Sequence, residues 1–345
     1  MMKIGILGAG RTACAMTAYL MKQGIDTMIW CRDSDRVKTI SQHGISVSGA
    51  VSGFYYPEVT DDIERAAQSS DYLFVMTTSN GHLPVANRLK GELKQNQKIV
   101  IFNGNWGACE FYSVLSSEME EKNIPICETG AMIFLADYQG DVVHIKKIKE
   151  NISLASIPSC DAEVVVRELK PILPQMVSER SVVSTSLNNS NPVIHAPVTL
   201  FNITRMENAE EYYFYRDGAT ASVISFIEMI DEERCRVGKA IGAETQTCLE
   251  IINSFWPEKY NNLYEAIRKN KAYMSGIGPK STNYRYITED IPYGIRAIVE
   301  IGRITGVKTP YCDALLQCYY GLFPSLKKLG VDFANINLKE ISELQ

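Results

Sequence analysis

The chain has 345 residues, of which 46% are hydrophobic and 22% are charged, a composition typical of a globular protein with two domains. Its formal net charge of −5 argues against a surface that binds nucleic acid or an anionic membrane. No apolar run approaches the roughly 20 residues that a membrane-spanning helix needs, and the apolar stretch at the N-terminus is too short for a signal peptide.

The first predicted element is a short apolar strand at residues 4–7, which leads into a glycine-rich turn and a helix. The pattern Gly8-x-Gly10-x-x-Ala13 opens this helix, whose apolar stripe runs to about residue 24. Gly8 permits a tight turn, Gly10 lets a pyrophosphate approach the backbone, and Ala13 keeps the helix close to the strand. Unpaired N–H groups and the positive end of the helix dipole would hold the phosphates. We therefore expect a dinucleotide site here, with an ordinary strand–helix turn as the alternative.

The second strand is expected to end at Arg32, where the adenosine ribose would lie. An acidic residue at that place suits the 2′-hydroxyl of NAD, whereas arginine suits the 2′-phosphate of NADP. Arg32 and Arg36 can bind phosphate through their planar guanidinium groups. The sequence therefore favours NADP, while Asp33 keeps NAD open and a solvated charged loop is the alternative interpretation.

The rest of the first half alternates between strand and helix patterns, which predicts a parallel sheet with helices on both faces. A Gly- and Ser-rich stretch up to residue 59 suggests hairpin-like strands, and the apolar run at residues 71–77 is typical of a central buried strand. Further strands are expected at residues 98–102, 125–129 and 142–157, and helices at residues 34–43, 61–68, 83–93, 110–122 and 161–169.

From Ser186 onward helical patterns dominate, at residues 193–208, 219–241, 245–254, 261–270, 293–305 and 311–320. We therefore divide the chain into a dinucleotide-binding domain at residues 1–186 and a helical substrate domain at residues 187–345. The predicted fold class is α/β plus all-α, with an N-terminal Rossmann domain followed by an all-helical domain. The cleft between two such domains is the default place for a substrate.

The nine cysteines are scattered and contain no C-x-x-C pair, which is typical of reduced thiols in the cytoplasm. No spacing of cysteine and histidine resembles a zinc site, so we expect no bound metal.

Two polar segments of the helical half are out of character for core positions. One contains His195 among apolar neighbours after an Asn-rich junction, and the other contains Arg285 and Asp290. Hydride transfer to a C=N or C=O bond needs a proton donor, and histidine titrates near neutrality. A carboxylate on the second ring nitrogen would fix the tautomer, and an arginine would hold a substrate carboxylate.

Each of these residues also has a structural interpretation. His195 can be a structural histidine near a helix start, and Arg285 a surface or interface charge. Asp290 or Glu289 can cap the next helix, with Pro292 in its first turn. Spacing alone does not join His195 to Asp290, because 95 residues separate them.

The order of a Rossmann domain, an Asn-rich junction ending in N-P-x-x-H-x-P, helices, and the segment R-Y-x-x-E-D-I-P-Y-G resembles the octopine/nopaline (opine) dehydrogenase family. The match spans nearly the whole chain and includes G-V-K-T-P at residues 306–310. The resemblance implies a helical domain arranged as in 6-phosphogluconate dehydrogenase. It also implies that His195 and Asp290 form the catalytic pair and that Arg285 helps to hold the substrate. The implied reaction condenses an α-keto acid with the amine of an amino acid, and NAD(P)H reduces the imine.

The same resemblance places Thr77 and Asn103 on loops that face the cofactor. Residues 128–134 match only the start of the family's Glu-containing strand, without the usual proline-aromatic continuation. His43, His82 and His144 are expected to be structural or surface residues, with His82 the nearest of the three to the cofactor.

Three functions stay open at this stage. The first is an opine-type dehydrogenase, and the second is a ketopantoate-reductase-like 2-keto acid reductase, whose catalytic lysine would be expected where this chain has His195. The third is a non-catalytic NADPH sensor. Small-molecule substrates are the expected partners, and the sequence leaves a homodimer open.

Overall fold

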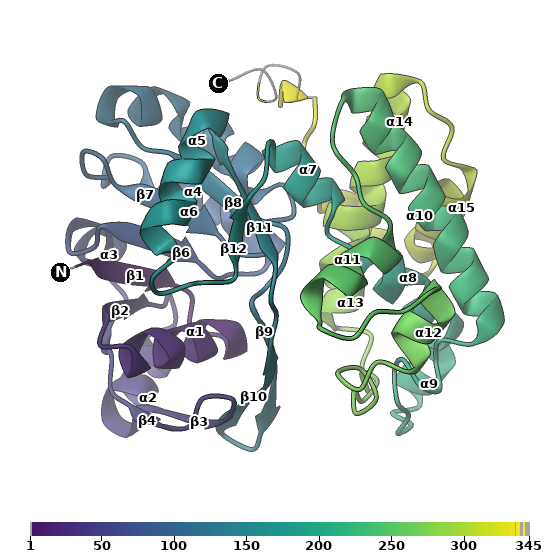
Figure 1. Ribbon diagram of the computed structural model, residues 1–345, viewed down its shortest axis with the longest axis horizontal. Coiled ribbons are helices and arrows are strands. Elements are labelled where there is room, and N and C mark those ends of the chain that lie inside the picture. Colours follow the sequence, from purple (N-terminus) through teal and green to yellow (C-terminus); the bar gives the residue numbers. More distant parts are fainter. Residues whose placement is uncertain (1, 335, 339–340, 342–345) are drawn as a thin grey trace. The chain divides into compact units, whose positions relative to one another are not determined.

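The computed structural model describes residues 2–334, 336–338 and 341, and it divides into two compact units (Figure 1). Of the described residues, the first unit contains 2–185 and Ile341, and the second contains 186–334 and 336–338. No helix of the described part is long and apolar enough to cross a membrane.

An eight-stranded sheet forms the centre of the first unit, in the order β12-β11-β8-β7-β6-β1-β2-β5. Its strands are β1 (Lys3–Leu7), β2 (Asp26–Trp30), β5 (Glu58–Thr60), β6 (Tyr72–Val75), β7 (Lys98–Ile101), β8 (Ile126–Thr129), β11 (Ile152–Ile157) and β12 (Met176–Ser178). Strands β1, β6 and β7 are almost entirely apolar and lie in the middle of the sheet, where both faces are covered.

The sheet is parallel, as predicted, except at one pair, where β11 runs antiparallel to β8. A parallel neighbour requires a crossover connection, usually a helix. Only the strands β9 (Phe134–Gln139) and β10 (Val142–Ile148) lie between β8 and β11 along the chain, so the chain returns in the opposite direction. The sequence analysis did not predict β9 or β12.

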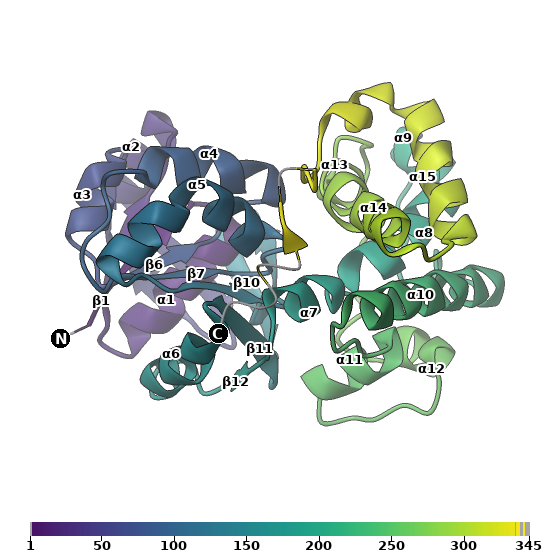
Figure 2. The same ribbon diagram turned by 90° about the horizontal axis from the view of Figure 1, so that it is seen from above.

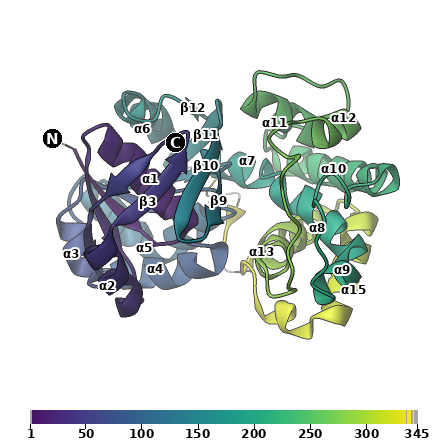
Figure 3. The ribbon, with the colours of Figure 1, turned by 90° about the horizontal axis from the view of Figure 1, so that it is seen from below.

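A smaller sheet has the order β4-β3-β10-β9 and lies beside α1 (Figure 3). Strands β3 (Ile45–Gly49) and β4 (Gly53–Tyr55) form the hairpin that the Gly- and Ser-rich stretch predicted. Strand β5, expected to belong to the same hairpin-like region, instead joins the main sheet parallel to β2.

Helices cover both faces of the main sheet, with α4 and α5 on one face and α1 and α6 on the other (Figure 2). The helices of this unit are α1 (Arg11–Lys22), α2 (Ser34–His43), α3 (Ile63–Gln68), α4 (His82–Leu89), α5 (Gly107–Lys122) and α6 (Ala162–Leu169), with short 3₁₀ turns η1 (Ser79–Gly81) and η2 (Ser159–Asp161). Helix α7 (Val182–Leu187) carries the chain across the boundary between the units.

The second unit consists of helices in its described residues. They are α8 (Asn191–Phe201), α9 (Ile203–Glu207), α10 (Ala221–Ile241), α11 (Cys248–Phe255), α12 (Leu263–Arg268), α13 (Arg285–Thr288), α14 (Arg296–Thr305) and α15 (Pro310–Leu322), with the π-helical segment η3 (Asp290–Ile295) and the 3₁₀ turn η4 (Pro324–Lys328).

Two expected helix boundaries differ for local reasons. The helix expected at residues 193–208 is divided at Asn202, whose side-chain amide donates to the carbonyl oxygens of Val198 and Gly218. The helix expected from residue 245 begins at Cys248, because Thr247 and Glu250 form a capping box there.

Candidate active site

The glycine-rich turn of the first unit has the geometry of a phosphate site. Gly8 has φ +131°, and a Cβ there would lie 2.8 Å from the carbonyl oxygen of Met76, so the position requires glycine. Gly10 has no atom within 4 Å of the place that a Cβ would take, which leaves the backbone open to a ligand. No side chain caps the N-terminus of α1 at Gly10, and Ala13 is fully buried against the sheet. These residues fit a dinucleotide pyrophosphate.

The end of β2 carries the charged residues that would meet the adenosine ribose. The carboxylate of Asp33 accepts hydrogen bonds from the backbone N–H groups of Asp35 and Arg36 and so caps α2. The Nε of Arg36 donates to the carbonyl oxygen of Ala9 at 3.3 Å, which brings its guanidinium onto the glycine-rich turn. Arg32 is exposed. Two cations and one capping acid therefore occupy this corner.

Thr77 and Asn103 follow the neighbouring strands β6 and β7, at the same edge of the sheet as Gly8. The Oγ1 of Thr77 is buried and has no hydrogen-bond partner among the described residues, so it can accept a ligand contact. Asn103 has φ +54°, and its backbone N–H donates to Thr129 Oγ1 at 2.9 Å. The carboxyl ends of parallel strands are where such folds bind nucleotides.

Three histidines lie outside any catalytic arrangement. His43 is exposed at the end of α2, and His144 shares a 2.9 Å hydrogen bond with Ser48 in the small sheet. His82 is fully buried, and its Nδ1 lies 3.8 Å from a carboxylate oxygen of Glu110. Burial, followed by the nearby Glu128 carboxylate, raises the pKa of Glu110 to about 8.

In the second unit, His195 and Asp290 meet across the 95 residues that separate them. His195 Nδ1 lies 2.7 Å from Asp290 Oδ2, and the two residues are 6% and 1% exposed. Because an ionised carboxylate only accepts, Nδ1 carries the proton and donates to Asp290. The contact therefore fixes the ring orientation and the tautomer, so that Nε2 is the ring nitrogen that can exchange a proton.

The close approach of α8 to η3 explains why these two residues meet. A Cβ at Gly294 of η3 would lie 2.2 Å from Pro192 Cβ in the first turn of α8, so only glycine fits there. Pro192 lies three residues before His195, and Gly294 lies four residues after Asp290. The proline and the glycine of the two sequence motifs thus bring their polar residues together.

The interpretation of Asp290 or Glu289 as a helix cap is wrong. Neither η3 nor α14 has a side-chain hydrogen bond at its N-terminus. The chain passes from α13 into a π-helical segment, an irregularity that occurs frequently at functional sites. This wider turn leaves the Asp290 carboxylate to bind His195.

Arg285 lies one helical turn before Glu289, and its Nε donates to Glu289 Oε2 at 2.9 Å. The negative charge of Glu289, together with that of Asp290, raises the pKa of Arg285 above its usual range, so the guanidinium stays cationic. The contact uses Nε, and the two terminal Nη atoms are the pair that a substrate carboxylate would bridge.

Aromatic side chains surround the histidine, and the sequence analysis did not identify them. The ring of Tyr286 lies 3.9 Å from the ring of His195 between centroids, and Phe214 lies edge-on at 5.7 Å. The hydroxyl of Tyr215 lies 3.0 Å from His195 Nε2. The sequence signal that could have identified these aromatic residues is the cluster of tyrosines at residues 212–215 and on both sides of Arg285.

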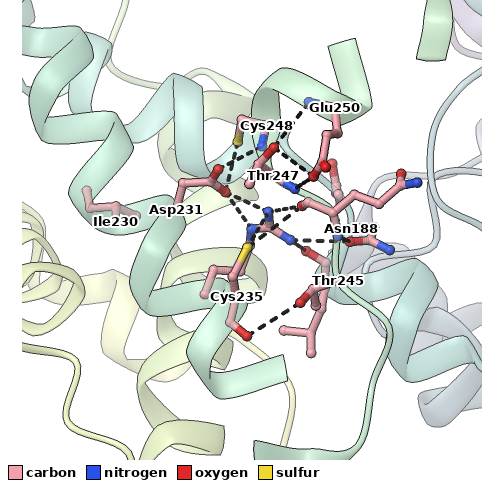
Figure 4. A network of polar contacts seen from close by, with 12 residues as sticks. Asn188, Ile230, Asp231, Cys235, Thr245, Thr247, Cys248 and Glu250 are labelled. Carbon is pink, nitrogen blue, oxygen red and sulfur yellow. Dashed lines mark hydrogen bonds and ion pairs between the residues drawn. The ribbon is translucent and has the colours of Figure 1, made fainter. Parts of the chain in front are cut away.

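A second buried polar network lies around Asp231, between α10 and the start of α11 (Figure 4). Arg234, which is 1% exposed, donates to Asp231 Oδ1 from Nε at 2.9 Å and also to the carbonyl oxygen of Leu187 at 2.8 Å. Asn188 joins the network by accepting from the backbone N–H of Gln246 at 2.9 Å. Asn188, which belongs to the Asn-rich junction between the two predicted domains, therefore has a structural role.

In the described residues, no three His, Cys, Asp or Glu side chains are grouped so that they could hold a metal ion.

Comparisons with known proteins match both units. Residues 178–322 match the family "NAD/NADP octopine/nopaline dehydrogenase, alpha-helical domain", and residues 4–110 match "Ketopantoate reductase PanE/ApbA". An opine dehydrogenase of Arthrobacter sp. (strain 1C) is 30% identical over 340 residues, covering 94% of each chain. A D-nopaline dehydrogenase of Agrobacterium tumefaciens (strain T37) is 24% identical over 91% of this chain and 84% of its own.

The fold matches a solved octopine dehydrogenase in complex with NADH and agmatine, with a TM-score of 0.78 and 14% identity over 99% of this chain and 96% of that one. It also matches an NADP⁺-bound yersinopine dehydrogenase, with a TM-score of 0.75 and 14% identity over 95% and 92% of the two chains. The prediction of a Rossmann unit followed by a helical unit is confirmed.

Proposed function

Because this chain belongs to the octopine/nopaline dehydrogenase family of NAD(P)-dependent oxidoreductases acting on CH–NH bonds, we propose that it reduces an imine formed from an α-keto acid and an amino acid. His195 is the general acid toward the imine nitrogen, Asp290 orients and polarises it, and Arg285 holds a substrate carboxylate. The observation that carries this proposal is the buried 2.7 Å contact between His195 and Asp290.

The electrostatics of the pair suit proton delivery. Asp290 stabilises the charge of the doubly protonated ring, which can then release the Nε2 proton to a substrate nitrogen. As that proton leaves, Nδ1 keeps its own proton because the carboxylate holds it. The ring therefore returns to one defined tautomer after each turnover.

Two kinds of substrate suit the charges of this site. Solved octopine dehydrogenases hold NADH with L-arginine in one case and NADH with pyruvate in another, an amino acid and a keto acid. In this chain, the Arg285 guanidinium is cationic and supplies a forked donor for the carboxylate that both kinds of molecule carry.

The cofactor is proposed to be NADP(H), which supplies the hydride when it is bound. Gly8, Gly10 and Ala13 would hold the pyrophosphate at the start of α1, and Thr77 and Asn103 would contact the half of the cofactor that carries the reacting ring. Arg32 and Arg36 would bind the 2′-phosphate. Asp33 keeps NAD possible, because it caps α2 through Oδ1 and its second carboxylate oxygen can still accept from a ribose hydroxyl.

The nine cysteines are all unpaired, which supports a cytoplasmic location for the enzyme.

The test of this function is a matrix of α-keto acids and amino acids in which the loss of NADPH absorbance is recorded. Imine reduction requires both substrates, so turnover with the keto acid alone should be absent for the productive pair. Mass spectrometry of the product should show the secondary amine that joins the two carbon skeletons.

A second candidate function is reduction of a 2-keto acid without an amine, because residues 4–110 match the ketopantoate reductase family. Turnover that needs no amine and yields a 2-hydroxy acid would establish this second function. Membership of an enzyme family argues against a non-catalytic sensor.

A further inference from the structure

Both ring nitrogens of His195 are engaged in hydrogen bonds. Nδ1 contacts Asp290 Oδ2 at 2.7 Å, and Nε2 contacts the Tyr215 hydroxyl at 3.0 Å. The three side chains thus form one linear chain, from a buried carboxylate through an imidazole to a phenol. The proposed proton delivery involves Asp290 and His195 and does not assign a role to Tyr215.

The proton positions along this chain follow from the donor and acceptor properties of its members. With Nδ1–H donating to the carboxylate, Nε2 of the neutral ring has a lone pair and can only accept. The Tyr215 hydroxyl must then be the donor. When the ring is doubly protonated, Nε2–H donates instead, and the same hydroxyl oxygen can accept. A hydroxyl matches both states of the ring, whereas a phenylalanine would match neither.

The tyrosine is held rigidly enough to act in this way. Its ring stacks on Tyr273 with centroids 4.8 Å apart and lies edge-on to Phe214 at 5.0 Å. Desolvation among these rings, followed by the nearby phenol of Tyr286, raises the pKa of Tyr215 well above its usual value. The side chain therefore stays a neutral phenol over the working pH range and does not become a competing base.

We propose that Tyr215 is a positioning residue, whose hydroxyl holds Nε2 of His195 in the free enzyme, gives that place to the substrate nitrogen during proton delivery, and donates to the neutral imidazole again afterwards. This inference rests on the proposed role of His195 as general acid. By holding the ring in one orientation before and after the transfer, the hydroxyl assists catalysis through His195 without touching the hydride. During the step, the proton leaves Nε2 for the substrate nitrogen, and the phenol proton stays on its oxygen.

Several titratable groups belong to or surround the hydrogen-bond chain of Asp290, His195 and Tyr215. Asp290 comes from η3, and Arg285 and Tyr286 come from α13. Tyr319 of α15 donates to the carbonyl oxygen of Ala196, the neighbour of His195, at 2.7 Å. None of these groups is altered by removal of the Tyr215 hydroxyl.

The experiment compares Tyr215→Phe with Tyr212→Phe. The first substitution keeps the stacked ring and removes the hydroxyl from Nε2. The second removes a hydroxyl from a tyrosine that is 2% exposed and whose oxygen has no hydrogen-bond partner among the described residues. Both variants lose one oxygen atom in the same segment, so a general effect on folding should affect them alike.

Tyr215→Phe should lower kcat about two- to tenfold, the range of one neutral hydrogen bond, with KM and NADPH affinity unchanged. The pH–rate profile should change as well, because the nitrogen that exchanges the proton loses its hydrogen-bond partner. Tyr212→Phe should match the wild type in all of these quantities.

A second measurement needs no turnover. In protein labelled with ¹⁵N-histidine, the Nε2 resonance of His195 is assigned by its loss in His195→Ala, and it should shift in Tyr215→Phe and stay in place in Tyr212→Phe. An unmoved resonance would overturn the proposal, as would an unchanged kcat and pH profile or a rise in KM alone. Absence of any imine reduction, with the resonance shifted as expected, would instead refute the proposed function and leave the hydrogen bond in place.

Discussion

Two buried pairs of charge-bearing side chains in the helical unit, Arg234–Asp231 and His195–Asp290, differ in how completely their atoms are hydrogen-bonded. Arg234 and Asp231 lie one turn apart on α10, and the guanidinium donates both to the carboxylate and to backbone carbonyl oxygens. His195 and Asp290 come from distant parts of the chain, and their outer atom, Nε2, contacts only a hydroxyl that can donate or accept. The first arrangement has bonds that hold loops in place, whereas the second keeps an exchangeable proton. The comparison shows that burial of charge alone does not identify an active site.

The largest expected effect on stability comes from breaking the first pair with Arg234→Met. The change leaves the Asp231 carboxylate buried without its cation and removes the donors to the Leu187 and Gln246 carbonyl oxygens. The free energy of unfolding should fall by about 3–5 kcal/mol, measured by urea denaturation. The activity per folded molecule should stay close to that of the wild type.

The matched control is Arg303→Met, which breaks the exposed ion pair between Arg303 and Asp313. An exposed pair contributes at most about 1 kcal/mol, so this variant should unfold close to the wild type. Equal destabilisation by the two substitutions would contradict the structural role of Arg234.

A buried acid of the first unit, Glu110, sharpens the comparison: its basic neighbour is His82 at 3.8 Å, and no arginine or lysine of the described residues pairs with it. Its Oε2 has no hydrogen-bond partner among the described residues, and its pKa is raised to about 8. A carboxyl whose pKa is higher in the folded state stabilises the fold fully below its unfolded pKa of about 4.5. That stabilisation is lost progressively as the pH rises toward 8.

The free energy of unfolding of the wild type should therefore fall between pH 5 and pH 8 by on the order of a few kcal/mol. Glu110→Gln, which cannot ionise, should flatten this dependence. Its free energy of unfolding should fall less between pH 5 and pH 8 than that of the wild type. Glu163→Gln, at an exposed position of α6, is the control. Parallel pH curves for wild type and Glu110→Gln would show that Glu110 does not stay protonated.

The smallest expected effect concerns an arginine that, unlike Arg234, has only weak contacts. Arg36 donates to Ala9 O at 3.3 Å, so it can turn toward a phosphate. Arg36→Ala should weaken NADPH binding about tenfold, the loss expected for one charge-assisted contact at a partly exposed position, and leave NADH binding unchanged. Fluorescence titration measures both affinities. An equal loss for the two cofactors would remove the assignment to the 2′-phosphate, and Arg65→Ala serves as the surface control.

A structural feature could be predicted from the sequence when the residues that determine it lie close together along the chain. The glycine-rich turn, α1 and the first strands were predicted correctly because strand, turn and helix are adjacent and each residue type has a local reason. The reversed direction of β11 was not predicted, since it depends on the small sheet that β9 and β10 form with β3. The domain boundaries and the homodimer stay predictions.

The candidate site shows the same limit. Neither periodicity nor spacing connected His195 to Asp290, and only the resemblance to a family joined them. The physical connection is the contact between Pro192 and Gly294, which requires knowledge of how α8 packs on η3. Tyr215 was missed for the same reason, because its hydroxyl reaches Nε2 only after the loop that carries it folds back onto α8.

If His195 supplies the proton for imine reduction, the most direct measurement is the turnover of His195→Ala with a productive keto acid and amino acid. Loss of the general acid should lower kcat by about 10²- to 10⁴-fold, while fluorescence titration shows NADPH binding as in the wild type. Turnover equal to that of the wild type, with the fold intact, would contradict the account.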